Sequence, residues 1–375
     1  MEACLKKKKN IAIVTSNRAD YGLLYWLIRE INFDPTLKLQ LIVTGAHLDK
    51  KFGHTIQEIK KDKFPIAATI KQDLVPYYTK AFTSLKPDML IVLGDRLEIL
   101  TPCIAAVGLR IPITHIHGGE ITEGVLDEQV RHAITKMAHV HFAATPNYQK
   151  NIIQMGENPK RVFYLGAPGL EHLKRSQLLS KKSLEKILNF QIRAQTILVT
   201  LHPETLQAAS QSAIEPLLKV LQDLKLRAIF TSPNPDSGGL QILKAIQDFV
   251  SQHPQTSCFV PSLGHLKYLS LARCVDAVVG NSSSGIIEIP SLKIPTVNIG
   301  NRQKGRVMAR SIVSCKPTYS DIKSALQKVL NRRFKENLKE GNPYNSPGLF
   351  SKKAIQILKN KLSSNNLLHK TFHTL

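Results

Sequence analysis

The segment Gly280 to Glu288, GNSSSGIIE, has the residue types of an anion-binding turn. It follows the apolar run Cys274 to Val279 and leads into IIEIPSL, so it predicts a strand, a tight polar turn and the start of a helix. The serines offer hydroxyl donors beside the unpaired N–H groups of a first helical turn. Glu288 would repel a bare phosphate but could accept both hydroxyls of a ribose. The segment therefore favours a nucleotide diphosphate, although an ordinary Ser-capped helix accounts for it equally well.

Polar side chains also stand directly after other predicted strands, the position at which parallel α/β sheets bind ligands. Arg18 follows the first strand at a helix start, where a guanidinium and unpaired N–H groups could hold a phosphate together. Asp95 and Arg96 offer a carboxylate beside a cation, or simply a structural salt bridge. In the second half, His202 and Asn234 end two strands, and a histidine there can donate to a phosphate oxygen unless it is a satisfied core residue.

Acidic and histidine side chains gather after one strand of the first half, in HIHGGE and DEQVRH. His115 and His117 alternate along the chain, so we expect one to point into the sheet packing and the other toward a cleft. Asp127 and Arg131 lie four residues apart on one helical face, which a local ion pair would also explain. The cluster lacks HExxH spacing, so we expect no metal.

The charge balance indicates an anionic substrate or a basic surface. Lys and Arg number 51 against 28 acidic residues, a formal charge of +23. A single Trp, 6% aromatic residues and the lack of nucleic-acid motifs disfavour a polyanion-binding protein. Five scattered cysteines without CxxC spacing predict reduced thiols and a cytoplasmic location. No apolar run approaches the about 18 residues of a membrane span, so we expect no membrane partner.

The elements that must position these residues are short apolar runs rich in β-branched residues, which alternate with longer segments of helical period. The alternation restarts after the polar stretch from Glu171 to Lys186, which predicts two doubly wound, Rossmann-like domains facing a ligand cleft. We expect an N-terminal domain over residues 1–170, a C-terminal domain over 171–350, and a helix and tail over 351–375 that pack back on the domains. Residues 363–375 are predicted to be frayed. The expected strands are Ile11 to Thr15, Leu39 to Thr44, Met89 to Leu93, Ile111 to Ile116, Val140 to Ala144, Val162 to Leu165, Thr196 to Leu201, Arg227 to Thr231, Thr256 to Val260, Val275 to Val279, Thr296 to Ile299 and Ser311 to Ser314.

Eight motifs in register resemble the UDP-N-acetylglucosamine 2-epimerases, specifically the hydrolysing branch of sialic- and legionaminic-acid-type pathways. The non-hydrolysing branch has a GTRPE-like first loop and HVEAGLR where this chain has NRADYG and HIHGGEI. The resemblance implies a glycosyltransferase B-type fold, two Rossmann-like domains around a cleft. The motifs are NRADYG (17–22), VTGAHLD (43–49), GDR (94–96), HGGE (117–120), DEQVRHAITK (127–136), HPE (202–204), GNSSSGIIE (280–288) and NIGNRQKGR (298–306).

The resemblance implies a reaction without metal or other cofactor. A base removes the C2 proton of the sugar while UDP leaves C1, giving a 2-acetamidoglycal, and water then adds with C2 inverted. Asp95 and Asp127 would be the catalytic carboxylates, with Arg96 beside Asp95. One departure is His117, which stands where some members have Glu, and one extra residue precedes Asp127. Glu120 or Glu123 would then supply the missing carboxylate, or His117 itself would act as acid or base.

The resemblance also implies how the nucleotide is held. Glu288 would clamp the ribose, and Asn234 would contact the sugar or the nucleotide. The expected diphosphate and uridine contacts are Arg18, His202, Ser282, Ser283 and Arg302.

Several functional alternatives stay open at this point. The substrate is UDP-N-acetylglucosamine or UDP-N,N'-diacetylbacillosamine, and the sugar-pocket residues do not separate the two. A glycosyltransferase of the same fold and a non-hydrolysing 2-epimerase are the alternative activities. From the family we expect a homodimer or homotetramer.

Overall fold

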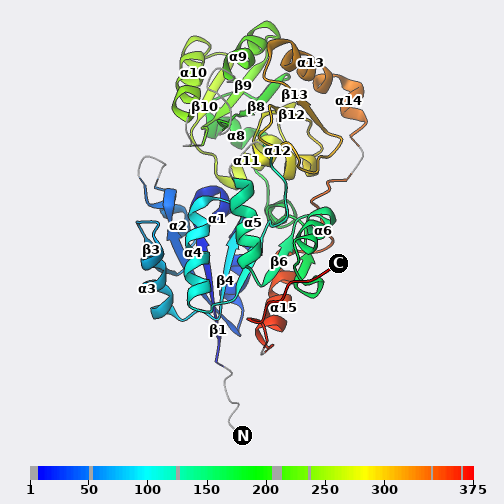
Figure 1. Cartoon of the computed structure of the whole chain (residues 1–375). Coiled ribbons are helices and arrows are strands. Elements are labelled where there is room, and N and C mark those ends of the chain that lie inside the picture. Colours follow the sequence, from blue (N-terminus) through cyan, green and yellow to red (C-terminus); the bar gives the residue numbers. More distant parts are fainter. Residues whose placement is uncertain are drawn as a thin grey trace. The chain divides into compact units, whose positions relative to one another are not determined.

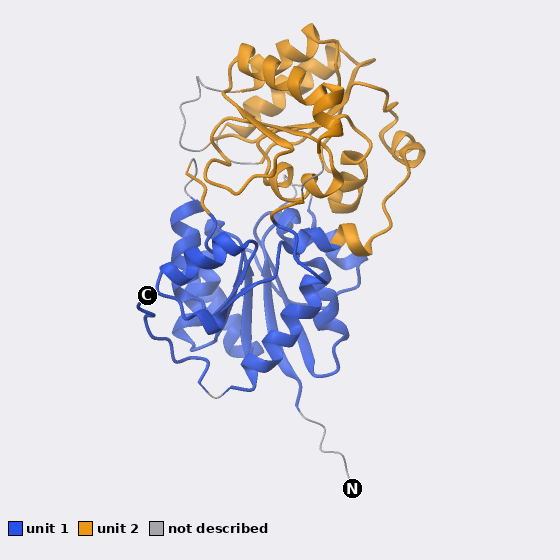
Figure 2. Cartoon of the chain, turned by 90° about the vertical axis from the view of Figure 1, so that its right-hand side faces the viewer, with its two compact units in different colours: residues 1–120, 127–171, 344–375 blue, residues 121–126, 172–343 orange. Residues whose placement is uncertain are grey.

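The computed structural model describes residues 7–49, 54–123, 127–204, 213–234, 238–338, 341–364 and 366–375. The chain forms two compact units (Figure 2). Unit 1 comprises residues 1–120, 127–171 and 344–375, and unit 2 comprises residues 121–126 and 172–343. Each unit contains one parallel sheet with helices on both faces, so the predicted pair of α/β domains is confirmed.

Unit 1 is built on a seven-stranded sheet in the order β3-β2-β1-β4-β5-β6-β7. Helices α1 and α15 cover one face, and α3, α4 and α5 cover the other (Figure 1). Because both faces are covered, β4 and β5 are buried along their whole length and β1 is buried from Ile11 onward, as in other parallel sheets. The strands are β1 (Lys9–Thr15), β2 (Leu37–Thr44), β3 (Ile66–Ile70), β4 (Met89–Leu93), β5 (Ile113–Ile116), β6 (Val140–Ala143) and β7 (Val162–Tyr164). The helices are α1 (Arg18–Phe33), α2 (Ile56–Lys61), α3 (Val75–Leu85), α4 (Leu97–Gly108), α5 (Asp127–Met137), α6 (Pro146–Gln154) and α15 (Phe350–Leu362).

Unit 2 is built on a six-stranded parallel sheet in the order β10-β9-β8-β11-β12-β13. Helices α9, α10 and α13 pack on one face, and α8 and α11 pack on the other. The strands are β8 (Thr196–Thr200), β9 (Arg227–Thr231), β10 (Ser257–Val260), β11 (Ala277–Gly280), β12 (Thr296–Ile299) and β13 (Ile312–Cys315). The helices are α7 (Glu171–Arg175), where the chain leaves unit 1, α8 (Lys181–Leu188), α9 (Ile214–Asp223), α10 (Gly239–Gln252), α11 (Gly264–Ala272), α12 (Ser283–Ile287), α13 (Tyr319–Leu330) and α14 (Arg332–Glu336).

The strand order reverses once in each sheet, and the reversal marks where a ligand would bind. In unit 1 the switch point lies between β1 and β4, and in unit 2 it lies between β8 and β11. Open parallel sheets bind ligands outside the carboxyl ends of the strands at such points. The polar clusters predicted after β1, β4, β8 and β11 therefore stand at the two switch points.

The sequence analysis missed strand β3, the edge strand of unit 1. Its sequence, IAATI, is short, and its residues are only partly buried until Ile70. An edge strand pairs on one side only and needs no continuous apolar run, so it gives a weak signal in sequence.

The prediction that residues 363–375 are frayed is wrong for the described part of this segment. Helix α15 packs against α1, and the tail beyond it is tied down by hydrogen bonds. The Arg161 guanidinium donates to the carbonyls of Leu367 (2.9 Å) and His369 (2.6 Å), and Lys370 Nζ donates to the carbonyl of Ala138 (2.5 Å) just past α5. The tail sequence is polar, but its basic side chain finds the unpaired carbonyls of a helix end.

Among the described residues, no helix is long and apolar enough to cross a membrane.

Candidate functional site

Arg131 is the centre of the polar cluster in unit 1. Its side chain on α5 is fully buried and donates from Nε to Oδ2 of Asp95 (3.0 Å). From Nη1 it also donates to Oε2 of Glu128 (2.6 Å) and to the backbone carbonyl of Glu120 (2.7 Å). One buried guanidinium thus joins three chain segments, namely the end of β4, the loop after β5 and the first turn of α5. Charge-assisted bonds of this kind are strong and directional, so the carboxylates are held in fixed positions.

A second link between β4 and α5 runs through His115, which is fully buried on β5. Its Nε2 lies 2.8 Å from the carbonyl oxygen of Gly94 and its Nδ1 lies 3.2 Å from Oγ1 of Thr135. Burial is the main reason that the pKa of His115 falls to about 3, so its ring is neutral at physiological pH. Of the two alternating histidines, His115 is the one that points into the sheet packing, where it positions the residues around Asp95.

The loop after β5 holds His117 and Glu120 against each other. Nδ1 of His117 is hydrogen-bonded to Oε1 of Glu120, and both side chains are buried. His117 has a left-handed backbone (φ 66°), which is uncommon for a residue with a Cβ. A Cβ on Gly119 would lie 2.4 Å from the carbonyl oxygen of Tyr148, so only glycine fits there. His117 is therefore a buried side chain whose ring is oriented by Glu120.

The other candidates near this cluster separate clearly. Arg96 donates to Glu98 (2.9 Å), and Asp95 pairs with Arg131. Glu123, in contrast, is half exposed, pairs with Lys304 (2.6 Å) and belongs to unit 2.

The first turn of α5 carries both Asp127 and Glu128. Glu128 is engaged at both oxygens, by Arg131 and by Nε2 of His132 (3.0 Å). It therefore braces the helix start. Arg131, in the same helix, pairs with Asp95 and with Glu128.

Helix α1 begins as predicted directly after β1. Asn17 is its N-cap and forms a capping box with Asp20, and Arg18 is the first helical residue. Asp20 is buried and accepts hydrogen bonds from the backbone N–H (2.8 Å) and hydroxyl (2.8 Å) of Ser16. Burial by itself would raise the pKa of Asp20, but hydrogen bonds and the charge of His47 outweigh it and lower the pKa. Burial also lowers the pKa of Arg18, against the influence of Glu58.

In unit 2, the residues after β8, β9 and β11 meet through neutral hydrogen bonds. The Asn281 side chain accepts from the backbone N–H of His202 (2.7 Å) and donates to its carbonyl (2.8 Å). The backbone N–H of Asn234 donates to Nδ1 of His202 (3.0 Å). Because Nδ1 accepts this bond, the proton of the neutral ring is on Nε2, which makes Nε2 a donor. This is the form that a phosphate oxygen requires.

The loop after β12 is hydrogen-bonded to the segments around His202 and Asn281. Glu204 Oε1 accepts from the backbone N–H of Asn301 (2.9 Å), and the side chains of Arg302 (3.3 Å) and Gln303 (2.9 Å) both donate to the carbonyl of Asn281. Arg302 is thus brought beside the segment that holds His202.

The serine-rich turn has the predicted strand–turn–helix form. Gly280 ends β11 with φ 134°, and a Cβ there would lie 1.9 Å from the carbonyl oxygen of Thr200. Ser282 is the N-cap of α12 and Ser283 is its first residue. Glu288 is buried and follows the last residue of this five-residue helix, so it lies at the helix's C-terminal end and not on the first turn. Burial, with a smaller contribution from Glu288, raises the pKa of Tyr268.

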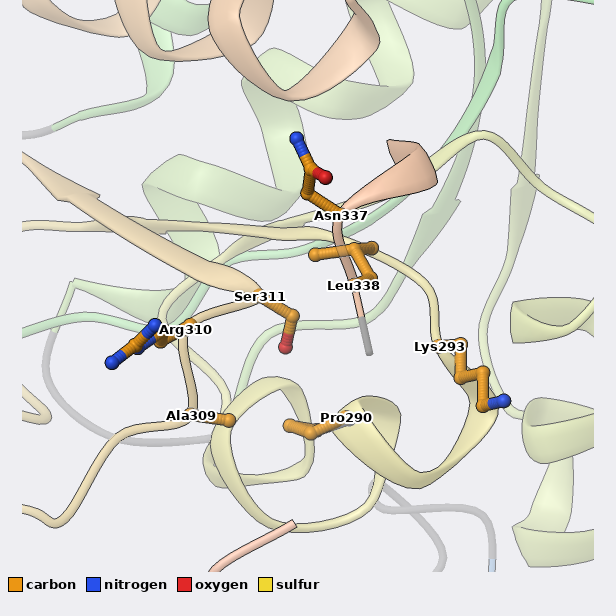
Figure 3. A pocket seen from close by; sticks show the side chains of 7 residues that line it. All are labelled: Pro290, Lys293, Ala309, Arg310, Ser311, Asn337 and Leu338. Atoms are coloured by element: carbon orange, nitrogen blue, oxygen red, sulfur yellow. The ribbon is translucent and has the colours of Figure 1, made fainter. Parts of the chain in front are cut away.

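One small cavity in unit 2 is separate from these residues (Figure 3). Its volume of about 10 Å³ is roughly what one water molecule needs. It is lined by Pro290, Lys293, Ala309, Arg310, Ser311, Asn337 and Leu338. It holds none of the predicted nucleotide contacts and is far too small for a nucleotide sugar.

Sequence reasoning missed the residues that brace the site. Arg131 was noted only as a helical neighbour of Asp127, and Asn281, Glu204 and Gln303 received no role. Their signal was present, since each falls within or beside one of the eight motifs, but their long-range partners cannot be read from spacing.

The chain is similar to known proteins over nearly its whole length. Residues 29–359 match the family model described as UDP-N-acetylglucosamine 2-epimerase. The chain is 38% identical to the GDP/UDP-N,N'-diacetylbacillosamine 2-epimerase (hydrolyzing) of Campylobacter jejuni, over 97% of this chain and 99% of that protein. It is 34% identical to the UDP-N,N'-diacetylbacillosamine 2-epimerase (hydrolyzing) of Legionella pneumophila, over 96% and 98% of the two chains.

A solved structure supports the fold. The UDP-GlcNAc 2-epimerase of Neisseria meningitidis, crystallised with UDP-GlcNAc, superposes with a TM-score of 0.79 at 19% identity, over 94% of this chain and all of that one. The two-domain, glycosyltransferase B-type fold is thereby confirmed, as is the resemblance read from the motifs. The chain belongs to the UDP-N-acetylglucosamine 2-epimerase family, and its named relatives at 34–38% identity are hydrolysing enzymes.

Proposed function

We propose that this protein is a hydrolysing 2-epimerase that converts UDP-N,N'-diacetylbacillosamine and water into UDP and the free 2-epimeric, manno-configured sugar. The observation that carries the proposal is the set of acidic residues gathered by buried Arg131 at the switch point of unit 1, in a chain of this family. The names of the Campylobacter and Legionella relatives favour this sugar over UDP-N-acetylglucosamine. The product would feed a legionaminic-acid-type pathway.

The chemistry needs both negative charge and proton handling near the sugar. C2 is not adjacent to a carbonyl, so its proton is poorly acidic, and the transition state must carry positive charge at C1. Fixed carboxylates stabilise such charge, since they need no reorganisation as it develops. We assign this role to Asp95, held by Arg131, and proton handling to Asp127, the position in the DEQVRHAITK motif that the family resemblance marks as a catalytic carboxylate.

The leaving group would be held by unit 2. Nε2–H of His202, the Arg302 guanidinium and the Ser282 and Ser283 donors suit the diphosphate oxygens. Glu288 suits the ribose hydroxyls. Stabilising the departing diphosphate makes UDP a better leaving group and lowers the barrier of C1–O cleavage.

Arg18 of unit 1 and Asn234 of unit 2 complete the proposed substrate contacts. Arg18 stands at the N-terminus of α1, where the helix dipole adds to the guanidinium charge. The backbone N–H of Asn234 donates to His202 and so places Asn234 beside it. We therefore propose that the side chain of Asn234 contacts the nucleotide or the sugar.

One experiment tests the reaction and the substrate together. The protein is incubated with each UDP-sugar alone in deuterated water, and UDP and the sugar are followed by NMR. We expect acceptor-independent UDP release and deuterium at C2 of a manno-configured product, faster with UDP-N,N'-diacetylbacillosamine. Release without deuterium, or a strict need for an acceptor, would instead indicate simple hydrolysis or glycosyl transfer.

We also propose that the protein is a homodimer. Helix α4 exposes Leu97, Ile104 and Val107 along one stripe, and neighbouring α3 adds Leu74 and Tyr77. An apolar stripe of this kind suits a second copy of the chain. Light scattering after gel filtration should give twice the chain mass, and Ile104→Arg should shift it to the monomer. A monomeric wild type would refute the dimer without affecting the activity.

We propose a cytoplasmic location, on the basis of the cysteines. Within the described ranges, Cys103, Cys258, Cys274 and Cys315 are free thiols. Free thiols persist in reducing compartments.

A further inference from the structure

The loop after β5 contains a histidine–carboxylate pair for which the carboxylate chemistry above gives no role. His117 and Glu120 are three residues apart, buried, and joined through Nδ1 of the ring. Since a carboxylate oxygen only accepts, Nδ1 carries the proton in this bond. In the neutral ring the lone pair is then on Nε2, the nitrogen that faces away from Glu120.

Nε2 of His117 is buried and has no hydrogen-bond partner within the part of the chain that the structure describes. Buried polar atoms are nearly always satisfied, and exceptions gather at functional sites. His115, two residues earlier, shows the contrast, because both of its ring nitrogens lie within hydrogen-bond distance of protein oxygens.

The backbone of His117 is held in a left-handed conformation that residues with a Cβ rarely adopt. His117 adopts φ 66° and Gly119 adopts φ 73°. Three hydrogen bonds hold them there. The N–H of His117 donates to the Phe142 carbonyl (3.2 Å), Nδ2 of Asn151 donates to the Gly119 carbonyl (2.8 Å), and Arg131 donates to the Glu120 carbonyl (2.7 Å). Strain sustained by the surrounding structure is typical of functional positions.

Arg131 also fixes where the pair lies. The same guanidinium that holds the Glu120 carbonyl holds the carboxylate of Asp95, so the histidine loop and Asp95 meet at the switch point of unit 1. An imidazole whose Nδ1 is held by a carboxylate, as Glu120 holds His117, and whose Nε2 makes no hydrogen bond to the described residues has the arrangement of a general base with its orienting partner.

We infer that Nε2 of His117 is the base that removes the proton from C2 of the sugar, and that Glu120 is the residue that orients it. This inference rests on the proposed function. As the C2–H bond breaks, its electrons form the C1–C2 double bond, the C1–O bond breaks and UDP leaves with the electron pair. The proton stays on His117, whose imidazolium Glu120 stabilises, and passes to solvent. On the opposite face the carboxyl group of Asp127 protonates C2, water bonds to C1, and the second water proton restores that carboxyl.

The assignment explains why histidine can replace the carboxylate that some relatives have at this position. A bare imidazole accepts a proton as a carboxylate does, provided that a partner fixes its tautomer. Glu120 supplies that partner, so the two candidates left open by the sequence act as one unit.

The test compares His117→Gln, His117→Glu and Glu120→Gln, with His253→Gln as the control on unit 2. We expect His117→Gln to lower kcat about 100-fold with UDP affinity unchanged, and Glu120→Gln to lower it about 10-fold. His117→Glu should recover most of the rate, and the acid limb of its kcat/KM profile should move to lower pH by a unit or more, since carboxylates titrate below histidines. A substrate deuterated at C2 should show a larger isotope effect with His117→Gln than with the wild type.

The outcomes separate this inference from the function on which it rests. If the wild type releases no UDP from either UDP-sugar, the proposed function fails. If the wild type turns over but His117→Gln keeps a near-normal kcat, or His117→Glu keeps the wild-type acid limb, His117 is not the base. Thermal denaturation and UDP binding of each variant show that it is folded, so a lost rate is a lost chemical step.

Discussion

At the switch point of unit 1 the side chains are held by charge, whereas at the switch point of unit 2 they are held by neutral amides and backbone groups. Buried Arg131 fixes Asp95 and Glu128 through ion pairs. In unit 2, Asn281 holds His202 through two backbone hydrogen bonds. The loop after β5 and the turn after β11 each contain a glycine, Gly119 and Gly280, that leaves no room for a Cβ. The interactions that order the side chains around them differ.

The difference fits the proposed division of roles, in which unit 1 carries out the chemistry on the sugar and unit 2 binds UDP. Charges that must stabilise a transition state have to be fixed in advance, because reorganising them during the reaction raises the barrier. Donors that only hold a charged ligand can be placed by neutral bonds, since these carry no large desolvation cost when the site is empty. The comparison therefore predicts that unit 1 variants act on stability and turnover, and that unit 2 variants act on UDP affinity.

The largest effect should come from removing the charge at the centre of unit 1. Arg131→Met leaves Asp95 and Glu128 without their buried partner, and breaking a buried ion pair costs about 3–5 kcal/mol. Arg302→Met in unit 2 is the matched control and should cost about 1 kcal/mol or less, because its hydrogen bond to the carbonyl of Asn281 is made by a side chain that is not fully buried. Urea denaturation measures both. Equal losses of unfolding free energy would remove the distinction between the two switch points.

Charge also anchors the other end of α5, and pH can release it. Burial by itself would raise the pKa of Glu157, but hydrogen bonds from His141, Lys136 and Lys370 outweigh it and lower the pKa to about 2, from an ordinary value of 4.5. The folded state thus prefers ionised Glu157, and this stabilisation is complete above pH 4.5 and lost as pH falls toward 2. Glu157→Gln should lose about 3 kcal/mol of unfolding free energy at pH 7.

The decisive measurement for Glu157 is the unfolding free energy at acid pH. The difference in unfolding free energy between Glu157→Gln and the wild type should shrink between pH 4.5 and pH 2, while Glu215→Gln, at an exposed position of α9, should match the wild type throughout. A difference that does not change with pH would mean that the side chain acts through packing and not through its charge.

Turnover should respond most directly to Asp95. Asp95→Asn keeps the shape but loses the negative charge that faces developing positive charge at C1, so we expect kcat to fall about 100-fold or more. Asp127→Asn should lower it comparably if that residue handles a proton. UDP affinity should stay the same in both. Asp248→Asn on α10 is the surface control, and a near-normal kcat in either site variant would remove that residue from the mechanism.

The sheets were predictable from sequence because buried parallel strands are continuous apolar runs. The twelve expected strands all occur, with ends shifted by up to two residues, and their polar termini identified the switch-point residues. Edge strand β3 and the ordered tail beyond α15 were not predicted, because neither is marked by a continuous apolar run. In the tail, order comes from Lys370 and Arg161 meeting carbonyls far away in the chain, which no local pattern encodes.

The candidate residues were predictable, but their partners were not. Asp95, His117 and Glu120 stand after strands, and their chemistry was evident from residue type. That Arg131 gathers Asp95 with the loop of Glu120, or that Glu123 goes instead to Lys304, depends on tertiary contacts. The sequence therefore left the roles of His117, Glu120 and Glu123 open, and only the geometry separates them.

The smallest effect is expected at the ribose end of unit 2. Glu288 is buried at the C-terminal end of α12, and Glu288→Ala would lose charge-assisted hydrogen bonds to the ribose, a loss of about 1.5–3 kcal/mol at most. We expect UDP binding by calorimetry to weaken about 10- to 100-fold while kcat changes little, because no reacting atom is involved. Glu215→Ala is the exposed control. If Glu288→Ala lowered kcat and left UDP affinity intact, unit 2 would share in the chemistry, and the division between a reacting unit and a holding unit would have to be abandoned.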